Sequence, residues 1–275
     1  MRTVVVTGAT SGIGRATALD LAAHGFRVVA TARTEEKAAK LTAAAAEAGL
    51  ELRTVLLDVT DPVSCQDAVA EIDEQTGGGP WALVNNAGVV VPGAVEDVAE
   101  ADARQVLEVN LLGAARLTRL VLPGMTRRGG GRIVQISSVA GRFATPLNGW
   151  YCASKHALEA LTDALRCEVA ARGIRVSLIE PGCVDTPLLT DALAAPPPAD
   201  SVHGAAYAAT RRLLALHRPV PPERVARAVR RALLAPRPRR RYGVGPEAAV
   251  APLVRLVPAA VADTVVRAVL RMNAG

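Results

Sequence analysis

Short apolar runs alternate along the first two thirds of the chain with longer segments in which apolar residues recur at helical spacing. The runs are Thr3–Thr7, Arg27–Thr31, Leu52–Leu57, Ala82–Asn85, Arg132–Ser137 and Arg175–Ile179. The helical segments are Ile13–His24, Glu35–Ala48, Pro62–Thr76, Ala101–Met125 and Tyr151–Arg172. The runs are mostly continuous rather than alternating, which is typical of strands buried on both faces of a parallel sheet. The repeated strand–helix order predicts an α/β fold, with a doubly wound sheet of about seven strands flanked by helices.

The pattern changes after the sixth run. Residues 187–219 are rich in Ala and Leu and contain Pro196–Pro198, so we expect a helical flap over a binding site. Pro221–Leu234 returns to helical spacing, and Tyr242–Gly245 is a candidate for the last strand. Neither a linker nor an internal repeat divides the sequence, so residues 1–275 are expected to form a single domain.

Residues 250–272 form an amphipathic C-terminal segment. Its apolar residues recur at helical spacing, Arg255, Asp263 and Arg267 interrupt them, and Pro258 breaks the segment. Three roles stay open: the segment caps the substrate site, joins subunits, or lies on a membrane surface as a peripheral contact. Packing onto its own domain or onto a partner subunit is the favoured interpretation.

The composition places weak limits on function. Half of the 275 residues are apolar, which is enough for a sizeable core. The formal net charge of +6 comes almost entirely from Arg, since Lys37, Lys40 and Lys155 are the only lysines. Such Arg usage beside abundant Ala is typical of GC-rich coding, so we expect no nucleic-acid partner. The one dense basic run, Arg237–Arg241, is predicted to be a solvated loop.

The cysteines suggest a reducing compartment. Cys65, Cys152, Cys167 and Cys183 have neither C-x-x-C spacing nor a neighbouring His cluster, so we expect free thiols and no metal site. The start of the sequence lacks the pattern of a signal peptide, and no run of about 20 apolar residues could span a membrane. These features predict a soluble, cytoplasmic protein.

A glycine-rich turn joins the first strand to the first helix. Its sequence, Thr7-Gly8-Ala9-Thr10-Ser11-Gly12-Ile13-Gly14, is what a dinucleotide-binding fold of the Rossmann type places at this point. The first glycine allows a tight turn, the second lets the backbone approach a pyrophosphate, and the third lets helix and strand pack closely. The helix start offers free N–H groups and partial positive charge to phosphate. The candidate cofactor-binding residues here are Gly8, Ser11, Gly12, Ile13 and Gly14.

The glycine spacing G-x-x-x-G-x-G resembles that of the short-chain dehydrogenase/reductase family. Further marks of the family follow in order: Asn85-Asn86-Ala87-Gly88 after the fourth strand, Ser138 after the fifth, and Tyr151-x-x-x-Lys155 in the next helix. The resemblance covers about Thr3–Thr186. It implies a Rossmann-like fold and a nicotinamide cofactor.

The end of the second strand bears on the choice of cofactor. An acidic residue there would hydrogen-bond the adenosine 2′-hydroxyl and favour NAD(H). The chain has Ala32 at that place, followed by Arg33, whose guanidinium suits a 2′-phosphate. Ser11 could add a hydroxyl to the same phosphate. We therefore favour NADP(H) over NAD(H).

The resemblance implies further cofactor contacts. Asp58 and Val59 would lie at the adenine, although Asp58 could instead cap the helix near Pro62, for which Asp61 is the better candidate. The small residues that follow Asn85, whose own role is expected to be structural, would let the cofactor lie close. The segment after the sixth strand would bind the nicotinamide. The residues implied at these two places are Asn86, Ala87, Gly88, Pro181, Gly182, Val184 and Thr186.

Four residues match the family's catalytic group: Asn110, Ser138, Tyr151 and Lys155. The spacing of Tyr151 and Lys155 puts both on one helix face. The resemblance implies that Tyr151 is the general acid in reduction and the base in oxidation. A nearby ammonium is expected to lower the tyrosine pKa from about 10, and Lys155 would also hold the nicotinamide ribose. Ser138 would hydrogen-bond the substrate oxygen, and Asn110, in the middle of a helix, would position a water behind the lysine.

The sequence from Tyr151 to Glu159 resembles the branch of 17β-hydroxysteroid and retinol dehydrogenases. Together with the apolar flap it predicts a hydrophobic carbonyl or secondary alcohol substrate, with steroid, retinoid and polyketide types left open. Two other functions stay as alternatives: an epimerase or dehydratase that keeps its cofactor, and a non-catalytic cofactor sensor. A homodimer or homotetramer is the expected assembly.

Overall fold

The computed structural model describes residues 2–216, 218–254 and 256–272. The strands are β1 Thr3–Val6, β2 Arg27–Ala32, β3 Arg53–Leu56, β4 Ala82–Asn85, β5 Gly131–Ile136, β6 Ile174–Pro181 and β7 Arg241–Val244. The main helices are α1 Gly12–Ala23, α2 Glu35–Glu47, α3 Pro62–Thr76, α4 Glu100–Leu107, α5 Ala114–Arg127, α6 Gly149–Glu168 and α9 Pro222–Leu234. Four helices follow late strands: α7 Pro187–Ala194, α8 Gly204–Ala215, α10 Pro246–Val254 and α11 Ala259–Val269.

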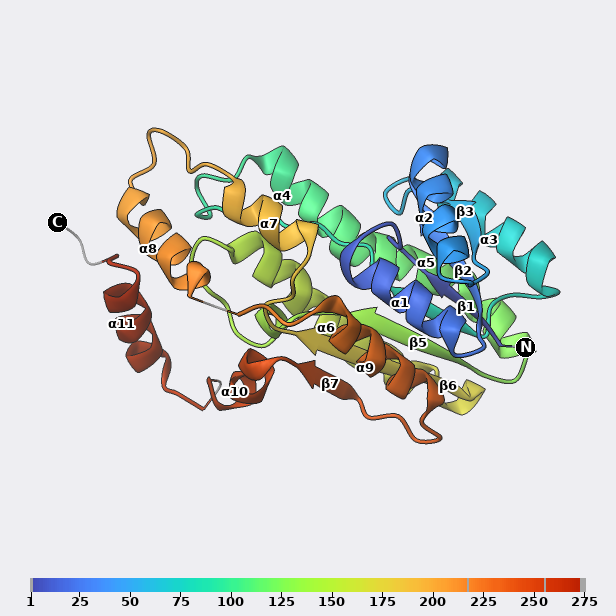
Figure 1. Ribbon diagram of the computed structural model, residues 1–275. Coiled ribbons are helices and arrows are strands. Elements are labelled where there is room, and N and C mark those ends of the chain that lie inside the picture. The colour runs from blue at the N-terminus through green and yellow to red at the C-terminus, as the bar shows by residue number, and fades with distance from the viewer. Residues whose placement is uncertain (1, 217, 255, 273–275) are drawn as a thin grey trace.

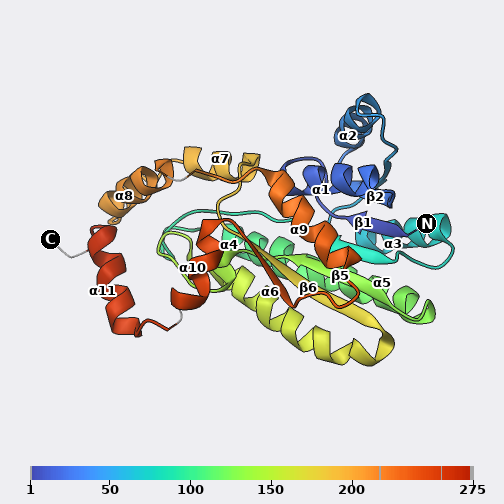
Figure 2. The same cartoon turned by 60° about the horizontal axis from the view of Figure 1, so that its bottom comes forward.

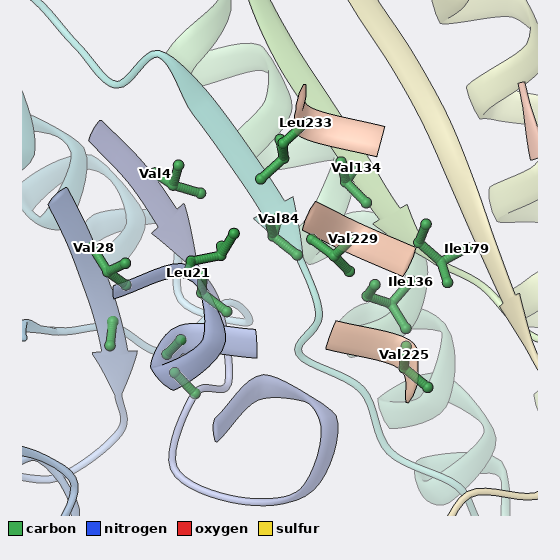
Figure 3. Close-up of a cluster of buried hydrophobic side chains, with 14 of the residues drawn as sticks. Val4, Leu21, Val28, Val84, Val134, Ile136, Ile179, Val225, Val229 and Leu233 are labelled. Atoms are coloured by element: carbon green, nitrogen blue, oxygen red, sulfur yellow. The ribbon is translucent and has the colours of Figure 1, made fainter. Parts of the chain in front are cut away.

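The seven strands form one parallel sheet in the order β3-β2-β1-β4-β5-β6-β7. Helices cover both faces, as the doubly wound prediction requires (Figure 1). Alternate residues of a strand point to opposite faces, so Val4 and Val6 pack under α1, α2 and α9, while Val5 packs under α3, α5 and α6. Figure 3 shows the first of these two cores, where Val225, Val229 and Leu233 of α9 meet the central strands. The predicted single α/β domain is confirmed.

The helical stretch predicted over Ala101–Met125 is confirmed, but it is not α-helical throughout. A π-helical turn, Glu108–Gly113, separates α4 from α5. In this wider turn the Asn110 side chain hydrogen-bonds the backbone of Val89. It accepts from Val89 N at 2.8 Å and donates to Val89 O at 2.9 Å. Gly113 also lies so close to Val59 that an added Cβ would stand 2.9 Å from that side chain. The long-range partners of this turn explain why helical spacing alone could not reveal it.

Two smaller predictions also change. Helix α6 begins at Gly149, so Tyr151 lies in its first turn and does not open it. The basic run is a solvated loop only as far as Arg240. Arg241 enters β7 and is half-buried, with ion pairs to Glu159 at 3.0 Å and Asp163 at 2.6 Å.

The flap and the C-terminal segment form an arc of helices around the carboxyl ends of the strands (Figures 1 and 2). A polar group fastens α8 to the loop before α4: Tyr207 donates to Asp97 at 2.8 Å and accepts from Ala94 N at 2.9 Å. Ser201 donates to the same carboxylate at 2.6 Å. The expected break at Pro258 separates α10 from α11. Within the described ranges, no helix is both long and apolar enough to cross a membrane.

Candidate active site

A cavity of about 830 Å³ lies at the carboxyl ends of the strands, the edge at which open α/β sheets bind their ligands. Every cofactor-binding and catalytic candidate from the sequence lines it except Asn110, which lies behind the wall. The cavity extends from the glycine-rich turn to α11. The chain therefore brings to one place residues more than 250 positions apart.

The glycine-rich turn has the backbone that its sequence predicts. Gly8 and Gly12 have φ angles of +60° and +50°, a region that side chains disfavour. An added Cβ at Gly14 would stand 2.2 Å from Gly8 O, so helix and turn could not pack with a larger residue. Asn86 braces the turn by donating to Thr7 O at 2.8 Å and to Gly8 O at 3.1 Å. The backbone is thus preformed, with room only for glycine.

The start of α1 fits a phosphate group. Ser11 is the N-cap residue of this helix, yet its side chain makes no capping hydrogen bond. The first N–H groups of the helix and the exposed Ser11 hydroxyl therefore face the cavity without a competing partner in the helix. This preformed, small-residue cradle is the observation by which the site fits a dinucleotide pyrophosphate.

The adenine end of the cavity is basic. Arg33 lies on the wall after β2, and Lys37 of α2 lies on the same wall. Asp58 accepts from Thr60 N at 2.9 Å, and this bond lowers the carboxyl pKa, with a smaller contribution from the charge of Arg33. Asp61, as predicted, caps α3 by accepting from Val63 N at 2.8 Å. Lys37 was missed because one turn of α2 separates it from any motif.

Asn110 belongs to the support of the catalytic helix. It is buried and donates to Ser154 Oγ at 3.0 Å, and Ser154 donates in turn to Tyr151 O at 2.7 Å. Lys155 Nζ lies near Asn110, because both approach Gly88. A Cβ built at Gly88 would stand 3.3 Å from Asn110 Oδ1 and 3.8 Å from Lys155 Nζ. The π-helical turn therefore places Asn110 behind the lysine, as the sequence suggested.

Lys155 is held in a defined position deep in the site. Its ammonium donates to Ile136 O at 2.9 Å and lies 5.6 Å from the centre of the Tyr151 ring. Burial lowers the pKa of Lys155 to about 8, although the charge of Glu159, one turn further along α6, opposes the shift. A lysine with such a pKa is charged at neutral pH and loses its proton in mildly alkaline solution.

The pKa of Tyr151 shifts opposite to our expectation. Burial of the phenol raises the Tyr151 pKa to about 12, and a hydrogen bond with Ser138 opposes that rise. We expected Lys155 to lower the value, but desolvation of the phenolate is the larger effect in this chain. Tyr151 thus keeps its proton at neutral pH and is set up as an acid.

Ser138 is oriented by backbone groups. Its hydroxyl donates to Pro181 O at 3.3 Å and accepts from Ala140 N at 3.1 Å. Ser138 also follows the carboxyl end of β5, while Tyr151 is in the first turn of α6. The fold consequently turns both hydroxyls toward the same region of the cavity.

The segment after β6 closes the central part of the site. Thr186 caps α7 and lies against the glycine-rich turn, with its methyl group 3.0 Å from a Cβ built at Gly12. Glu247 of α10 also reaches this segment, and one of its carboxylate oxygens is buried without a hydrogen-bond partner. Burial and this carboxylate raise the pKa of the neighbouring Cys183 to about 11. No sequence pattern points to Glu247, because only the pairing of β7 brings it here.

The far end of the cavity is apolar. Its lining comes from three helices that are distant in sequence, and its main side chains are Leu189, Leu193, Leu213, Val266, Val269 and Leu270. Leu270 packs in a small core with Ala206 and Tyr207 of α8. The C-terminal segment is thus part of the cavity wall.

Comparison with known proteins identifies the family. The model of the family described as short chain dehydrogenase matches residues 2–196. The uncharacterized oxidoreductase YbbO of Escherichia coli (strain K12) is 36% identical over 267 residues, which are 97% of this chain and 94% of that protein. Retinol dehydrogenase 5 of Homo sapiens is 38% identical over 285 aligned positions, covering 97% of this chain and 88% of its own.

A solved structure shows the same fold. It is a short-chain dehydrogenase from Streptomyces avermitilis, with a TM-score of 0.82 and 35% identity, and the match covers 93% of this chain and 92% of that one. The chain belongs to the short-chain dehydrogenase family, an oxidoreductase family whose cofactor is a nicotinamide dinucleotide. The resemblance stated from the motifs is confirmed.

Proposed function

We propose that the chain is an NADP(H)-dependent oxidoreductase acting on a carbonyl or secondary alcohol of a hydrophobic small molecule. The observation that carries the proposal is the cavity itself. Ser138, Tyr151 and Lys155 line its middle, a phosphate cradle lies on one side, and an apolar wall lies on the other. Cofactor and substrate would therefore meet at the catalytic hydroxyls.

The chain's own residues supply the proton chemistry. When bound, the cofactor supplies or accepts the hydride. In reduction, Ser138 donates a hydrogen bond to the substrate oxygen and stabilises the charge that develops there. Tyr151 then gives its proton to that oxygen, and in oxidation the same hydroxyl must first lose it. The Lys155 ammonium, held by Ile136 O, stabilises the negative charge of the phenolate that forms when Tyr151 gives up its proton.

The preference for NADP(H) is supported by the basic adenine end. Arg33 and Lys37 place two cations on the wall where a 2′-phosphate would lie, and Ala32 leaves no carboxylate to repel it. Asp58 lies beyond, at the position assigned to the adenine. Electrostatic attraction of two cations to a dianionic phosphate is the physical basis of this choice.

The proposed substrate is apolar and extended. The wall beyond Tyr151 comes from α7, α8 and α11, and branched aliphatic side chains predominate on it. Such a surface gains free energy from burying hydrocarbon, at roughly 25 cal/mol per Å². Carbonyl compounds of steroid, retinoid and polyketide type all fit this description. A cytoplasmic homodimer or homotetramer stays a prediction.

The test is a panel of ketones and alcohols with NADPH or NADP⁺, followed by the absorbance of NADPH at 340 nm. We expect turnover of large apolar carbonyls, and slower turnover of small polar ones. A cofactor sensor would bind NADPH without consuming it. An epimerase or dehydratase would convert its substrate with no net change of absorbance. Either result would replace the proposed reaction.

A further inference from the structure

Eleven of the 29 arginines of the chain lie at the end of the molecule opposite the active site. Parallel strands all begin at one edge of the sheet, and we call the loops and strand starts at that edge the amino rim. The amino rim consists of residues 2–3, 24–27, 48–53, 73–81, 127–132, 168–175 and 235–240. In Figure 1 it lies beside the N-terminus, far from the flap helices.

Charge is strongly segregated onto the amino rim. It contains eleven arginines and four acidic residues, for a net charge of +7. The rest of the chain has 21 basic and 22 acidic residues, for a net charge of −1. A uniform preference for Arg over Lys would spread the charge evenly. The rim therefore accounts for the entire net positive charge.

The arginines form a row across the sheet. Six of the seven strands have an arginine within their first two residues or just before them, and these are Arg53, Arg27, Arg2, Arg132, Arg175 and Arg240 in spatial order. Arg132 and Arg175 are direct register partners. With strands about 4.8 Å apart, the row is about 29 Å long.

Ion pairs do not neutralise the row. Among the described residues, no carboxylate comes within ion-pair distance of any of the eleven arginines. Ten of the eleven are exposed, and the half-buried Arg132 has its pKa lowered by burial and by the charges of Arg175 and Arg2. Like charges thus face one another along the rim.

Helix dipoles compensate part of the positive charge of the amino rim. Six helices (α1, α2, α3, α5, α6 and α9) end at the rim, because each leads into a strand. A helix C-terminus is equivalent to about −0.5 charge, so the six together offset about 3 of the 7 positive charges. A surplus of about +4 remains. Stabilising the fold does not require that surplus.

We infer that the amino rim binds a linear chain of phosphates, such as a nucleic-acid backbone or inorganic polyphosphate. A duplex carries one negative charge per 1.7 Å of its axis, so a segment as long as the row carries about 17 phosphates on its two strands together. Guanidinium groups bind phosphate in bidentate fashion. The sequence alone led us to expect no nucleic-acid partner, because the Arg content was interpreted as a coding bias and only Arg237–Arg241 forms a dense basic run.

The rim favours phosphates over bases or lipid. Trp81, just before β4, is the aromatic side chain best placed for stacking, but Arg2 covers it at 4.6 Å and Phe26 stacks on it at 6.1 Å. Within the described chain, the large exposed apolar side chains all lie outside the rim, many of them on α10 and α11. Without such side chains the rim cannot insert into a bilayer.

The test measures binding of fluorescein-labelled 20-mer single-stranded and duplex DNA by anisotropy, with the full chain, from 50 to 200 mM salt. Inorganic polyphosphate is the competitor. The rim variant carries R27Q, R53Q, R175Q and R239Q. Its matched control has the same net charge and carries R119Q, R212Q, R224Q and R227Q, four exposed positions outside the rim. Melting temperatures check that both variants are folded.

We expect the wild type to bind with an affinity that falls steeply with salt. Removing four phosphate contacts lowers the magnitude of the log–log salt slope by about 3 and weakens binding at least tenfold at 100 mM salt. The control variant should bind within about twofold of wild type, and the four Arg→Lys changes at the rim should restore most of the affinity. Binding of polyphosphate alone, or of DNA as well, tells which source of phosphates the rim accepts.

Four results would overturn the inference. They are absence of binding at 50 mM salt, equal loss in the rim and control variants, displacement of the DNA by saturating NADPH, and rim-dependent binding confined to vesicles containing phosphatidylglycerol. The second would reduce the effect to net charge, the third would move the DNA to the cofactor site, and the fourth would make the partner a lipid surface.

Discussion

At the scale of single residues, Tyr151 and Lys155 have pKa values displaced in opposite directions by the same cause. Burial disfavours each charged form, so the tyrosine pKa rises to about 12 and the lysine pKa falls to about 8. The neutral phenol and the ammonium are therefore both present at pH 7. This is the protonation pattern that carbonyl reduction needs, since the phenol gives a proton and the ammonium stabilises what is left.

Replacing Tyr151 with Phe tests the proton donor. The ring keeps its packing, but the hydroxyl that donates to the substrate oxygen is lost. We expect kcat to fall by at least 10³-fold, within the range known for loss of a general acid combined with an electrostatic contact. NADPH affinity, followed by fluorescence titration, should stay within a few fold. A variant that kept a tenth of its activity would exclude Tyr151 as the acid.

Arg33→Asp tests the cofactor preference. An aspartate there repels a 2′-phosphate and can accept from a 2′-hydroxyl, so the ratio of kcat/KM for NADPH to that for NADH should fall by about 10–100-fold. Arg224→Asp makes the same charge change at an exposed position of α9, outside the cavity, and should leave the ratio unchanged. An unchanged ratio in both variants would contradict the assignment of Arg33 to the 2′-phosphate.

At the scale of secondary structure, the sequence predicted what is local. The glycine-rich turn and the Tyr–Lys spacing were visible because each lies within one turn or one helix. The π-helical turn at Asn110 was not, since its cause is a hydrogen bond to Val89, 21 residues away. Glu247 was missed for the same reason, and the role of the C-terminal segment at the substrate site could be given only as one of three alternatives. Glu247 and this segment reach the cavity through the packing of late elements, which no local pattern encodes.

Helix α11 offers a test of substrate recognition, with a control on the same helix. Val269 lines the cavity, whereas Val261, two turns earlier and similarly exposed (50% and 52%), does not. Val269→Ser should raise KM for a large apolar ketone about threefold to tenfold, because one aliphatic contact is replaced by a hydroxyl, and leave KM for a small ketone unchanged. Val261→Ser should change neither. Equal effects in both variants would mean that α11 acts only through stability.

At the scale of the whole molecule, the two edges of the sheet differ in chemistry. The carboxyl edge gathers the cavity, its cradle and the catalytic side chains, as the α/β fold generally does. The amino edge gathers the positive charge. The order of strands could be expected from the repeated units, and with it the edge of the active site. The row of arginines could not, because it needs the register of six strands that are far apart in sequence.

The free energy of unfolding should depend on pH in a way that reflects the buried Lys155 of the active site. Below pH 8, Lys155 is charged in both the folded and the unfolded chain, so its burial opposes folding by about 3 kcal/mol. Between pH 8 and 10.5 the unfolded chain binds more protons at this group, and the stability contributed by Lys155 rises with pH. Lys155→Met removes the buried charge, which stabilises the fold. It also removes the hydrogen bond to Ile136 O, and this loss offsets about 1–2 kcal/mol of that stabilisation.

We therefore expect Lys155→Met to be inactive but more stable than wild type at pH 7, by about 1–2 kcal/mol or roughly 2–8 °C in Tm. The difference in Tm, followed by circular dichroism, should shrink as the pH rises from 8 to 10.5. Lys40→Met is the control, because Lys40 is exposed and pairs only with Glu36 across one helical turn, so its Tm difference should be small at every pH. A constant difference for Lys155→Met across this range would mean that the buried ammonium does not oppose folding, and that the Lys155 pKa is not depressed.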